Sequence, residues 1–534
     1  MAAPLLRARV PFNKVIQVSK TQQAEPESET NDIGHEIGEH NIEFLGLDIH
    51  NPVFAVSAIL SVLLVVVTLI FQEDATVILA DLRAWATSTF DWFFLIAANL
   101  FVVFCLTLAV SPLGRIRLGG VDAKPKYGYP GWLAMLFAAG VGIGLMFFGV
   151  LEPVTHALNP PLGVDPADVD TSRAIGMSAA IMHWGLHAWA IYAVVGLSLA
   201  FFCFNRGMPL TLRSAFFPLF GTSVWGPLGH FVDIVAVLAT LFGLAVSLGY
   251  GAEQIAAGLH YLFDIAATDT TKVVLIVIII GIALFSVVAG LDKGVKRLSE
   301  INMSLAALLW LFVVIAGPTT IIIATMSGAV VDYLRYLPSL SNWVGREDSE
   351  FLHGWTTFYW AWWISWSPFV GMFIARVSYG RTVREFITWV LIIPTIIGIL
   401  WMSTFGGTAL EQYFASGYTG VAEAAPELAL FKMLEQLPLT GIVSTVSVFL
   451  IAIFFVTSAD SGSLVMDIIT AGGKLDAPVA QRVFWCILAG LVAIALLLGG
   501  GMASLQALTI SIGLPFGVVL IVMCIGLLKG LREE

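Results

Sequence analysis

The sequence predicts an all-α polytopic membrane protein with twelve transmembrane helices, and three observations lead to this fold class. Of the 534 residues, 58% are hydrophobic and only 12% are charged, roughly half the charged share of a soluble domain. Twelve mostly apolar stretches are each long enough to cross a bilayer, which takes ~20 residues. Lysine and arginine also alternate from loop to loop, as expected for an even number of spans.

The twelve apolar stretches follow one another without a soluble insertion. They begin near Asn51, Phe93, Trp132, Ile175, Phe231, Val273, Met303, Trp355, Phe386, Ile442, Val483 and Leu505. Residues 1–50 are polar and acidic and contain no secretory leader, so we expect a disordered cytoplasmic tail. A short tail, residues 531–534, follows the last span.

Basic residues predict the orientation, because cytoplasmic loops are enriched in lysine and arginine. The loops after the even-numbered spans hold Arg115, Arg117, Lys124, Lys126, Arg206, Arg213, Lys293, Lys296, Arg297, Arg376, Arg381, Arg384, Lys474 and Arg482. The alternating loops are poor in basic residues and hold Asp165, Asp168, Asp170, Glu347, Asp348 and Glu350. We therefore expect both termini in the cytoplasm and the chain in a bacterial inner membrane.

Two spans carry residues that weaken a helix near its middle. In the third span Gly140, Gly142 and Gly144 alternate with apolar residues, and in the eighth span Pro368 removes a backbone donor. Transporters are often built from inverted repeats whose corresponding helices are broken at the substrate site. Because Gly140 and Gly144 also form a small-xxx-small pair, close helix packing is an equally good explanation of the glycines.

The spacing of these two spans predicts a five-plus-five arrangement. Residues 51–130 would form two peripheral helices, residues 131–330 the first five-helix repeat and residues 351–530 the second. Between them, Val331–Val344 mixes polar and apolar residues at helical spacing and is too short to span. We expect an interfacial helix and outer loop over residues 331–350.

Aromatic residues cluster in the interior of two spans. The fourth span carries Trp184, Trp189 and Tyr192, and the eighth carries Trp363 and Trp366 on one helix face. Interfacial belts explain tryptophan at span ends, not these. A trimethylammonium head has charge but no N–H to donate, and ring faces hold it with roughly 0.5–2 kcal/mol per contact. Such a box would need no buried carboxylate; ordinary aromatic packing is the alternative.

Hydroxyl groups gather in the tenth span, where Thr457 and Ser458 lie at membrane depth. Sodium prefers oxygen ligands, so these hydroxyls together with carbonyl groups freed in a broken third span predict a sodium site. Hydrogen bonds from each hydroxyl to its own helix are the alternative. Thr240 and Ser247 of the fifth span, two turns apart, give a weaker signal of the same kind. A phosphate-binding loop is absent from the sequence, which argues against ATP as the energy source.

Three segments resemble the betaine/choline/carnitine transporter family: HWGLHAWAIY from His183, FYWAWWISWSPFVGMF from Phe358, and TSADS from Thr457. The resemblance runs from about Trp132 to the last span. It implies twelve spans with an inverted five-plus-five core of the amino-acid:sodium symporter type, preceded by two extra helices, and assembly as a homotrimer.

The resemblance also implies functional residues. Its aromatic box matches Trp184, Trp189, Tyr192 and Trp363, with Trp366 and Phe373 along the adjoining pathway and the glycines Gly140, Gly142 and Gly144 beside the substrate. One sodium site matches Ala138, Val141, Phe454, Thr457 and Ser458. A second matches Thr240, Ser247 and Phe369, but Leu244 stands where the betaine prototype has a hydroxyl, so a second sodium ion is in doubt.

The resemblance favours sodium-coupled uptake of a methylated-onium zwitterion, either glycine betaine or an analogue such as dimethylsulfoniopropionate. Choline carriers tend to have an acidic residue where this chain has Gly144, which favours a zwitterion. The alternatives are a sodium-independent carnitine-type exchanger and an osmotic channel. An enzyme is not expected, because His183 and His187 lack a nucleophile. Beyond sodium ions, the lipid bilayer and the zwitterion, we expect no cofactor and no nucleic-acid partner.

Overall fold

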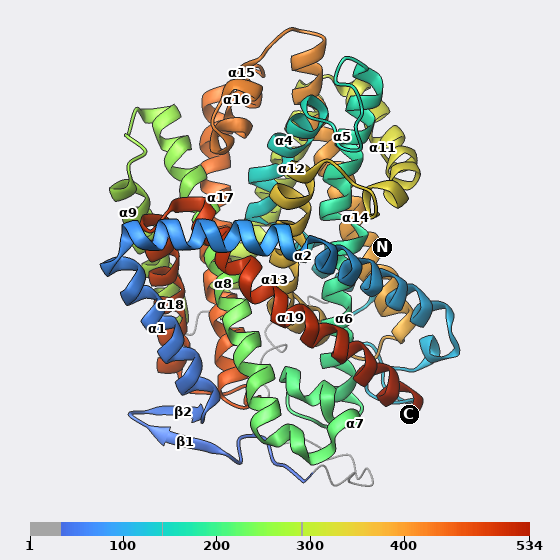
Figure 1. The fold of residues 1–534 in the computed structure, drawn as a ribbon, viewed down its shortest axis with the longest axis vertical. Helices are drawn as coiled ribbons and strands as arrows, with labels where there is room; N and C mark the ends of the chain where they lie inside the picture. Colours follow the sequence, from blue (N-terminus) through green and yellow to red (C-terminus); the bar gives the residue numbers. More distant parts are fainter. Residues whose placement is uncertain (1–33, 141, 290–291) are drawn as a thin grey trace, which may run out of the picture. The chain divides into compact units, whose positions relative to one another are not determined.

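Helices make up nearly all of the structure, a computed structural model that describes residues 34–140, 142–289 and 292–534 (Figure 1). Residues 36–534 form one unit. Its first half contains β1 (Asn41–Phe44), β2 (Leu47–His50), α1 (Val53–Ile70), α2 (Gln72–Val110), α3 (Tyr129–Gly140), α4 (Ile143–Leu158), α5 (Val169–Trp184), α6 (Leu186–Phe204), α7 (Phe217–Phe220), α8 (Pro227–Phe263) and α9 (Asp269–Val288). Its second half contains α10 (Asp292–Ala316), α11 (Thr319–Leu340), α12 (Ser349–Phe351), α13 (Thr357–Val377), α14 (Val383–Phe414), α15 (Gly420–Glu423), α16 (Ala429–Glu435), α17 (Thr440–Thr470), α18 (Val479–Leu498) and α19 (Gly501–Arg532).

The expected all-α polytopic fold class is confirmed. Within the described residues, 11 helices are long and apolar enough to cross a membrane, or 12 if the bent pair α3–α4 counts as one span. The set differs in one respect from the predicted stretches, because it includes α11 and does not include α13. Helix α13 is rich in tryptophan rather than aliphatic residues and is almost wholly buried among other helices.

The third span is broken at its glycines, as the sequence predicts. Helix α3 ends at Gly140, α4 begins at Ile143, and the segments Tyr129–Ala139 and Ile143–Leu158 are inclined by 64° to each other. Gly142 is fully extended, with φ −161° and ψ −173°. Helix α3 packs against α13 and α14, whereas α4 packs mainly against α5 and α14.

The predicted break in the eighth span is wrong. Helix α13 runs through Pro368 without interruption. Proline at this position leaves the carbonyl oxygen of Ile364 without its N–H partner, but the Ser367 hydroxyl donates to that oxygen (2.7 Å). This local replacement of the lost hydrogen bond lets the helix continue.

The fourth span has a break that was not predicted. Helix α5 ends at Trp184 and α6 begins at Leu186, with Gly185 between them. A Cβ atom on Gly185 would lie 2.7 Å from the carbonyl oxygen of Ile181, so the turn excludes a larger residue. As a result, Trp184 ends one helix, while Trp189 and Tyr192 belong to the next.

The expected disordered tail over residues 1–50 is wrong for residues 41–50, which form an antiparallel hairpin, and residues 1–33 of that expectation lie outside the described residues. Leu45 and Gly46 make a two-residue turn with φ of 50° and 80°, the left-handed values that tight hairpins need. The Asn41 amide donates to the Ala471 carbonyl oxygen (2.9 Å), and Lys474 Nζ lies 2.6 Å from Asp48 Oδ2. The hairpin is thus fastened to the turn between α17 and α18.

The predicted interfacial helix is also not a separate element. Helix α11 runs from Thr319 to Leu340 without a break, so residues 331–340 are its second half. Its C-terminal end is tied by the Arg346 guanidinium, which donates to the Leu340 carbonyl oxygen (3.1 Å). Few of its residues are buried within the chain.

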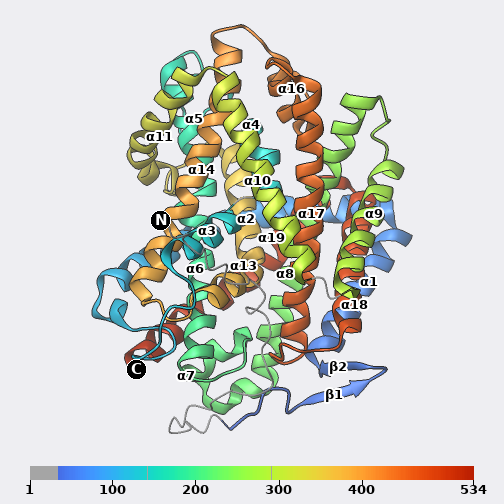
Figure 2. The same cartoon turned by 180° about the vertical axis from the view of Figure 1, so that it is seen from behind.

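Hydrogen bonds group the loops into the two sets that the basic residues predict. Among the basic loops, Arg117 donates to the Gly380 carbonyl oxygen (2.6 Å). Among the alternating loops, the Leu162 N–H donates to Asp348 (3.0 Å). Figure 2 shows the same division, with the hairpin and α7 at one end of the helices and α16 at the other. The inverted repeat and the direction of insertion stay predictions.

Candidate functional site

The four rings predicted to form a box lie together and are buried. Trp184, Trp189, Tyr192 and Trp363 are each no more than 9% exposed. The centroids of Trp184 and Trp363 are 4.9 Å apart at 72°, those of Tyr192 and Trp363 are 6.1 Å apart at 74°, and those of Trp189 and Tyr192 are 5.2 Å apart at 78°. Successive rings therefore meet nearly at right angles, as adjacent walls of a box do. Edge-to-face packing has the same signature.

Two glycines let the helices that carry these rings approach closely. A Cβ atom on Gly196 of α6 would lie 3.1 Å from the carbonyl oxygen of Gly371 on α13. A Cβ atom on Gly371 would lie 2.7 Å from the Val195 side chain. Small residues facing each other bring helix backbones together in membranes, and here they align α6 with α13.

The break at Gly185 supplies an anchor for Trp363. Because α5 ends at Trp184, its last carbonyl groups have no partner within the helix. The Trp363 indole N–H donates to one of them, that of His183 (2.8 Å). The Trp363 ring is thereby fixed against the C-terminal end of α5.

Gly144 makes room for the Trp184 ring. A Cβ atom at position 144 would lie 2.3 Å from Trp184 Cη2 and 3.4 Å from Trp362 Cη2. The glycine is thus required where the ring crosses α4. Gly142 differs, because a Cβ atom there would meet nothing within 4 Å. Of these two glycines, Gly144 is the one whose small size the aromatic cluster uses.

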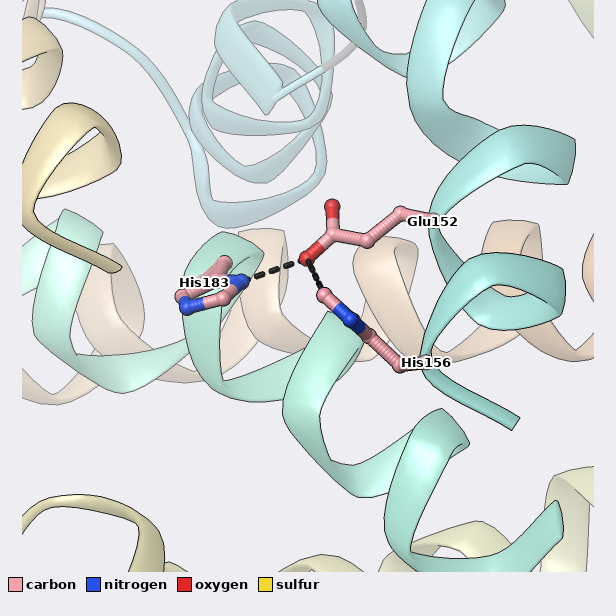
Figure 3. A group of neighbouring side chains, drawn as sticks. All are labelled: Glu152, His156 and His183. Atoms are coloured by element: carbon pink, nitrogen blue, oxygen red, sulfur yellow. Dashed lines mark hydrogen bonds and ion pairs between the residues drawn. The ribbon is translucent and has the colours of Figure 1, made fainter. Parts of the chain in front are cut away.

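A buried carboxylate that the sequence analysis missed lies beside the rings. Glu152 on α4 is fully buried and reaches His183, His156, Trp184 and Tyr359. Figure 3 shows its oxygen between the two imidazoles. The sequence analysis predicts a box that needs no buried carboxylate, so this residue was not expected. The one signal available was the spacing of Glu152 and His156, which puts both on one helix face.

Trp366 and Phe369 lie on α13, on the C-terminal side of Trp363. Their centroids are 4.9 Å apart, and both side chains are partly exposed. A Cβ atom on Gly243 of α8 would lie 3.2 Å from Trp366 Cε3. Trp366 therefore faces α8, next to the four rings rather than as one of their walls.

The predicted first sodium site draws its residues from the broken third span and from α17, and it stays a prediction. Thr457 and Ser458 lie on α17 and are partly exposed, and the Thr457 hydroxyl donates to the carbonyl oxygens of Ile453 (3.0 Å) and Phe454 (3.1 Å). Ala138 lies on α3 and Phe454 on α17, and both helices contact α13. Val141 lies outside the described residues.

The predicted second sodium site has its helices in contact but its hydroxyls engaged. Helices α8 and α13 pack together, and Thr240 and Ser247 are buried. The Thr240 hydroxyl donates to the Ala236 carbonyl oxygen (2.8 Å), and the Ser247 hydroxyl donates to that of Gly243 (3.4 Å). Leu244 fills the space against Gly462 of α17, where a Cβ atom would lie 2.8 Å from Leu244 Cδ2.

The fold and this buried aromatic cluster define a polytopic α-helical membrane transporter. Residues 52–534 match the model of the BCCT, betaine/carnitine/choline family transporters. The chain belongs to this family, and it is a transporter rather than an enzyme.

Three relatives are similar over nearly the whole chain. A glycine betaine/proline/choline transporter of Vibrio parahaemolyticus is 55% identical over 522 residues, which cover 94% of each chain. Glycine betaine transporter 1 of the same organism is 50% identical and covers 93% of this chain and 97% of its own length. A glycine betaine transporter of Acinetobacter baylyi is 43% identical over 91% of this chain and 74% of its own length.

Proposed function

We propose that this protein drives the uptake of glycine betaine, or of a close methylated-onium analogue such as dimethylsulfoniopropionate, with a sodium gradient. The observation that carries the proposal is the buried set of four rings on α5, α6 and α13. An onium head cannot donate a hydrogen bond, so ring faces are the groups that can replace its water inside a membrane. The names of the relatives agree with a betaine-type substrate and add choline and proline as candidates.

Alternating access would use the break between α3 and α4. A helix interrupted beside a substrate site leaves backbone carbonyls free to bind an ion. The break between Gly140 and Ile143 lies directly before Gly144, the second residue of α4, which touches the ring of Trp184. In this mechanism, sodium would bind between the broken helix and the hydroxyls of α17, namely Thr457 and Ser458. The bound ion would favour the state in which the rings face outside.

A sodium-independent exchanger is the second candidate. Such a carrier would need a fixed positive charge where sodium otherwise sits. In the sequence, no lysine or arginine lies within a helical turn of Thr457, Ser458, Thr240 or Ser247. In space, the Arg482 guanidinium pairs with Asp460 (2.6 Å), two residues from Ser458, so the exchanger stays a real alternative and the ion dependence of uptake decides between the two. We also propose a homotrimer in a bacterial inner membrane with both termini in the cytoplasm.

Uptake into proteoliposomes tests the proposal. The purified full-length chain is reconstituted, and the uptake of radiolabelled glycine betaine, dimethylsulfoniopropionate, carnitine, choline, proline and ectoine is measured with sodium or potassium outside. We expect saturable uptake of glycine betaine that stops when sodium is replaced. Equal uptake with potassium would support the exchanger, and uptake that does not saturate would indicate a channel.

A further inference from the structure

Glu152 is surrounded by hydrogen-bond donors from four different residues. Its Oε2 atom accepts from the Trp184 indole N–H (2.8 Å) and from the Tyr359 hydroxyl (2.6 Å). Its Oε1 atom lies 2.5 Å from His183 Nδ1 and 3.3 Å from His156 Nε2, as Figure 3 shows. A carboxylate accepts about four hydrogen bonds. The Trp184 indole and the Tyr359 hydroxyl are fixed donors that suit the ionised form, and each imidazole donates as well when the nitrogen facing Oε1 carries the proton.

The same three residues, Glu152, His156 and His183, have ligand atoms within 4.8 Å of one another, a grouping that could hold a metal ion. Their distances favour hydrogen bonds instead. Two ligands of one zinc ion lie roughly 3 Å or more apart, because each bond to the metal is about 2 Å long, whereas 2.5 Å separates Glu152 from His183. The Thr356 hydroxyl is 3.0 Å from His183 Nε2, so the second nitrogen is engaged as well.

Trp184 links this carboxylate to the aromatic box. Its indole N–H points to Glu152, its far ring edge lies over Gly144, and its ring meets Trp363 edge to face at 4.9 Å. The carboxylate thus holds one wall of the box from behind. A hydrogen bond to an anion also pushes electron density into the indole, which strengthens attraction of a cation to the ring face.

We propose that Glu152 is a positioning and specificity-determining residue that supplies the negative charge behind the box. This inference rests on the proposed function. The Glu152 charge attracts a net cation such as choline, and no part of choline is repelled. In a zwitterion the same charge attracts the onium head but repels the carboxylate, so the net effect on binding is smaller. Glu152 therefore raises the affinity for choline relative to glycine betaine.

The lack of space at Gly144 explains why the carboxylate does not come from that position and instead reaches the Trp184 ring at its N–H edge. An acidic side chain at position 144 would have its Cβ atom 2.3 Å from Trp184 Cη2 and would displace that ring. Eight residues further along α4, Glu152 reaches the opposite edge of the same indole. The carboxylate can then act on the onium head while the ring keeps its place.

The test compares ligand binding by Glu152→Gln and the wild type. Full-length protein in detergent is titrated with glycine betaine and with choline at a fixed sodium concentration, and binding is measured by competition with radiolabelled glycine betaine. A unit charge acting over roughly 8 Å at an effective dielectric constant of about 20 changes affinity by more than tenfold. We expect Glu152→Gln to weaken choline binding at least about tenfold and glycine betaine binding no more than about threefold.

Tyr359→Phe is the matched control, because it removes one donor to the carboxylate and leaves its charge. Because the charge remains, Tyr359→Phe only loosens the position of Glu152 and should weaken the binding of both ligands by one common factor. The ratio of the two affinities is therefore expected to stay at its wild-type value. A ratio that falls in Tyr359→Phe as far as in Glu152→Gln would overturn the role of the charge.

The outcomes separate this inference from the proposed function. Binding of neither ligand by the wild type would contradict the proposed function. Binding of glycine betaine with an unchanged ratio in Glu152→Gln would overturn only the role of Glu152. Should Glu152→Gln fail to fold, the wild type supplies the second measurement: choline has to displace glycine betaine, and a failure to do so overturns the inference.

Discussion

The aromatic box and the predicted sodium site differ in how their side chains are held. The box is built from side chains on α5, α6 and α13, and Trp184 and Trp363 are each held by an indole hydrogen bond, to Glu152 and to His183. The predicted sodium site combines α3 with α17, which both contact α13, and the Thr457 hydroxyl donates to its own helix. Packing and hydrogen bonds thus hold the aromatic groups in place, whereas the predicted ion groups are not joined by a hydrogen bond that would hold them together in the part of the chain that the structure describes.

Loss of a box wall should have the largest effect. Trp363→Leu removes a ring that contacts both Trp184 and Tyr192, and one cation–π contact in a dry site is worth about 2 kcal/mol or more. We expect uptake of every methylated cation to fall at least about thirtyfold. Trp343→Leu, at a tryptophan that is 39% exposed, is the control. Near-normal transport by Trp363→Leu would remove the box from the mechanism.

Crowding the ring should have the next largest effect. Gly144→Ala places a methyl group 2.3 Å from Trp184 Cη2, so the ring has to shift away from the box. We expect the affinity for glycine betaine to fall about tenfold, measured by equilibrium binding. In Gly131→Ala, where a Cβ atom meets nothing within 4 Å, affinity should be unchanged. Equal affinities in the two variants would show that the position of Trp184 does not matter.

The ion site should respond in a different way from the box. In Thr457→Ala the expected change is a rise of about fivefold in the sodium concentration for half-maximal uptake, with near-normal binding of glycine betaine at saturating sodium. Thr445→Ala is matched to it, because Thr445 lies on the same helix and bonds to its own backbone in the same way (2.7 Å). A sodium dependence that is the same in both variants would place the ion elsewhere.

The hairpin should show the smallest effect. Burial raises the pKa of Asp48, but hydrogen bonds from Lys474 and Asn41 outweigh it and hold the pKa below its usual value. A lowered folded-state pKa means that the contact stabilises the hairpin above pH ~4 and is lost as pH falls through the folded pKa. We expect Lys474→Met to lower the free energy of unfolding of the hairpin by less than about 1 kcal/mol.

Hydrogen exchange of residues 41–50 measures this contact. Exchange should quicken in Lys474→Met at pH 7, and in the wild type it should quicken beyond the intrinsic pH dependence only in acid. Identical exchange in the variant and the wild type would show that the ion pair does not hold the hairpin. Uptake should be the same in both proteins.

The parts predicted from the sequence are those set by repeated patterns along the chain. Apolar length was enough for the fold class, and aromatic spacing was enough to single out two interior clusters, whereas the choice of Trp184, Trp189, Tyr192 and Trp363 as one group came from the family resemblance. The errors lie where a distant partner or a single neighbour decides. Ser367 keeps α13 continuous at Pro368, and Glu152 finds its hydrogen-bond partners on α5 and α13. Neither contact can be predicted from the pattern of neighbouring residues.

The central claim is that ring faces replace the hydration of a methylated cation, and its most direct test compares glycine betaine with its uncharged-head isostere, 3,3-dimethylbutanoate. The two ligands share shape and carboxylate and differ in the charge of the head. Equilibrium binding to the wild type should be at least about thirtyfold tighter for glycine betaine, and this preference should shrink in Trp363→Leu. Equal or tighter binding of the isostere by the wild type would show that the rings form a merely apolar pocket and would contradict the claim.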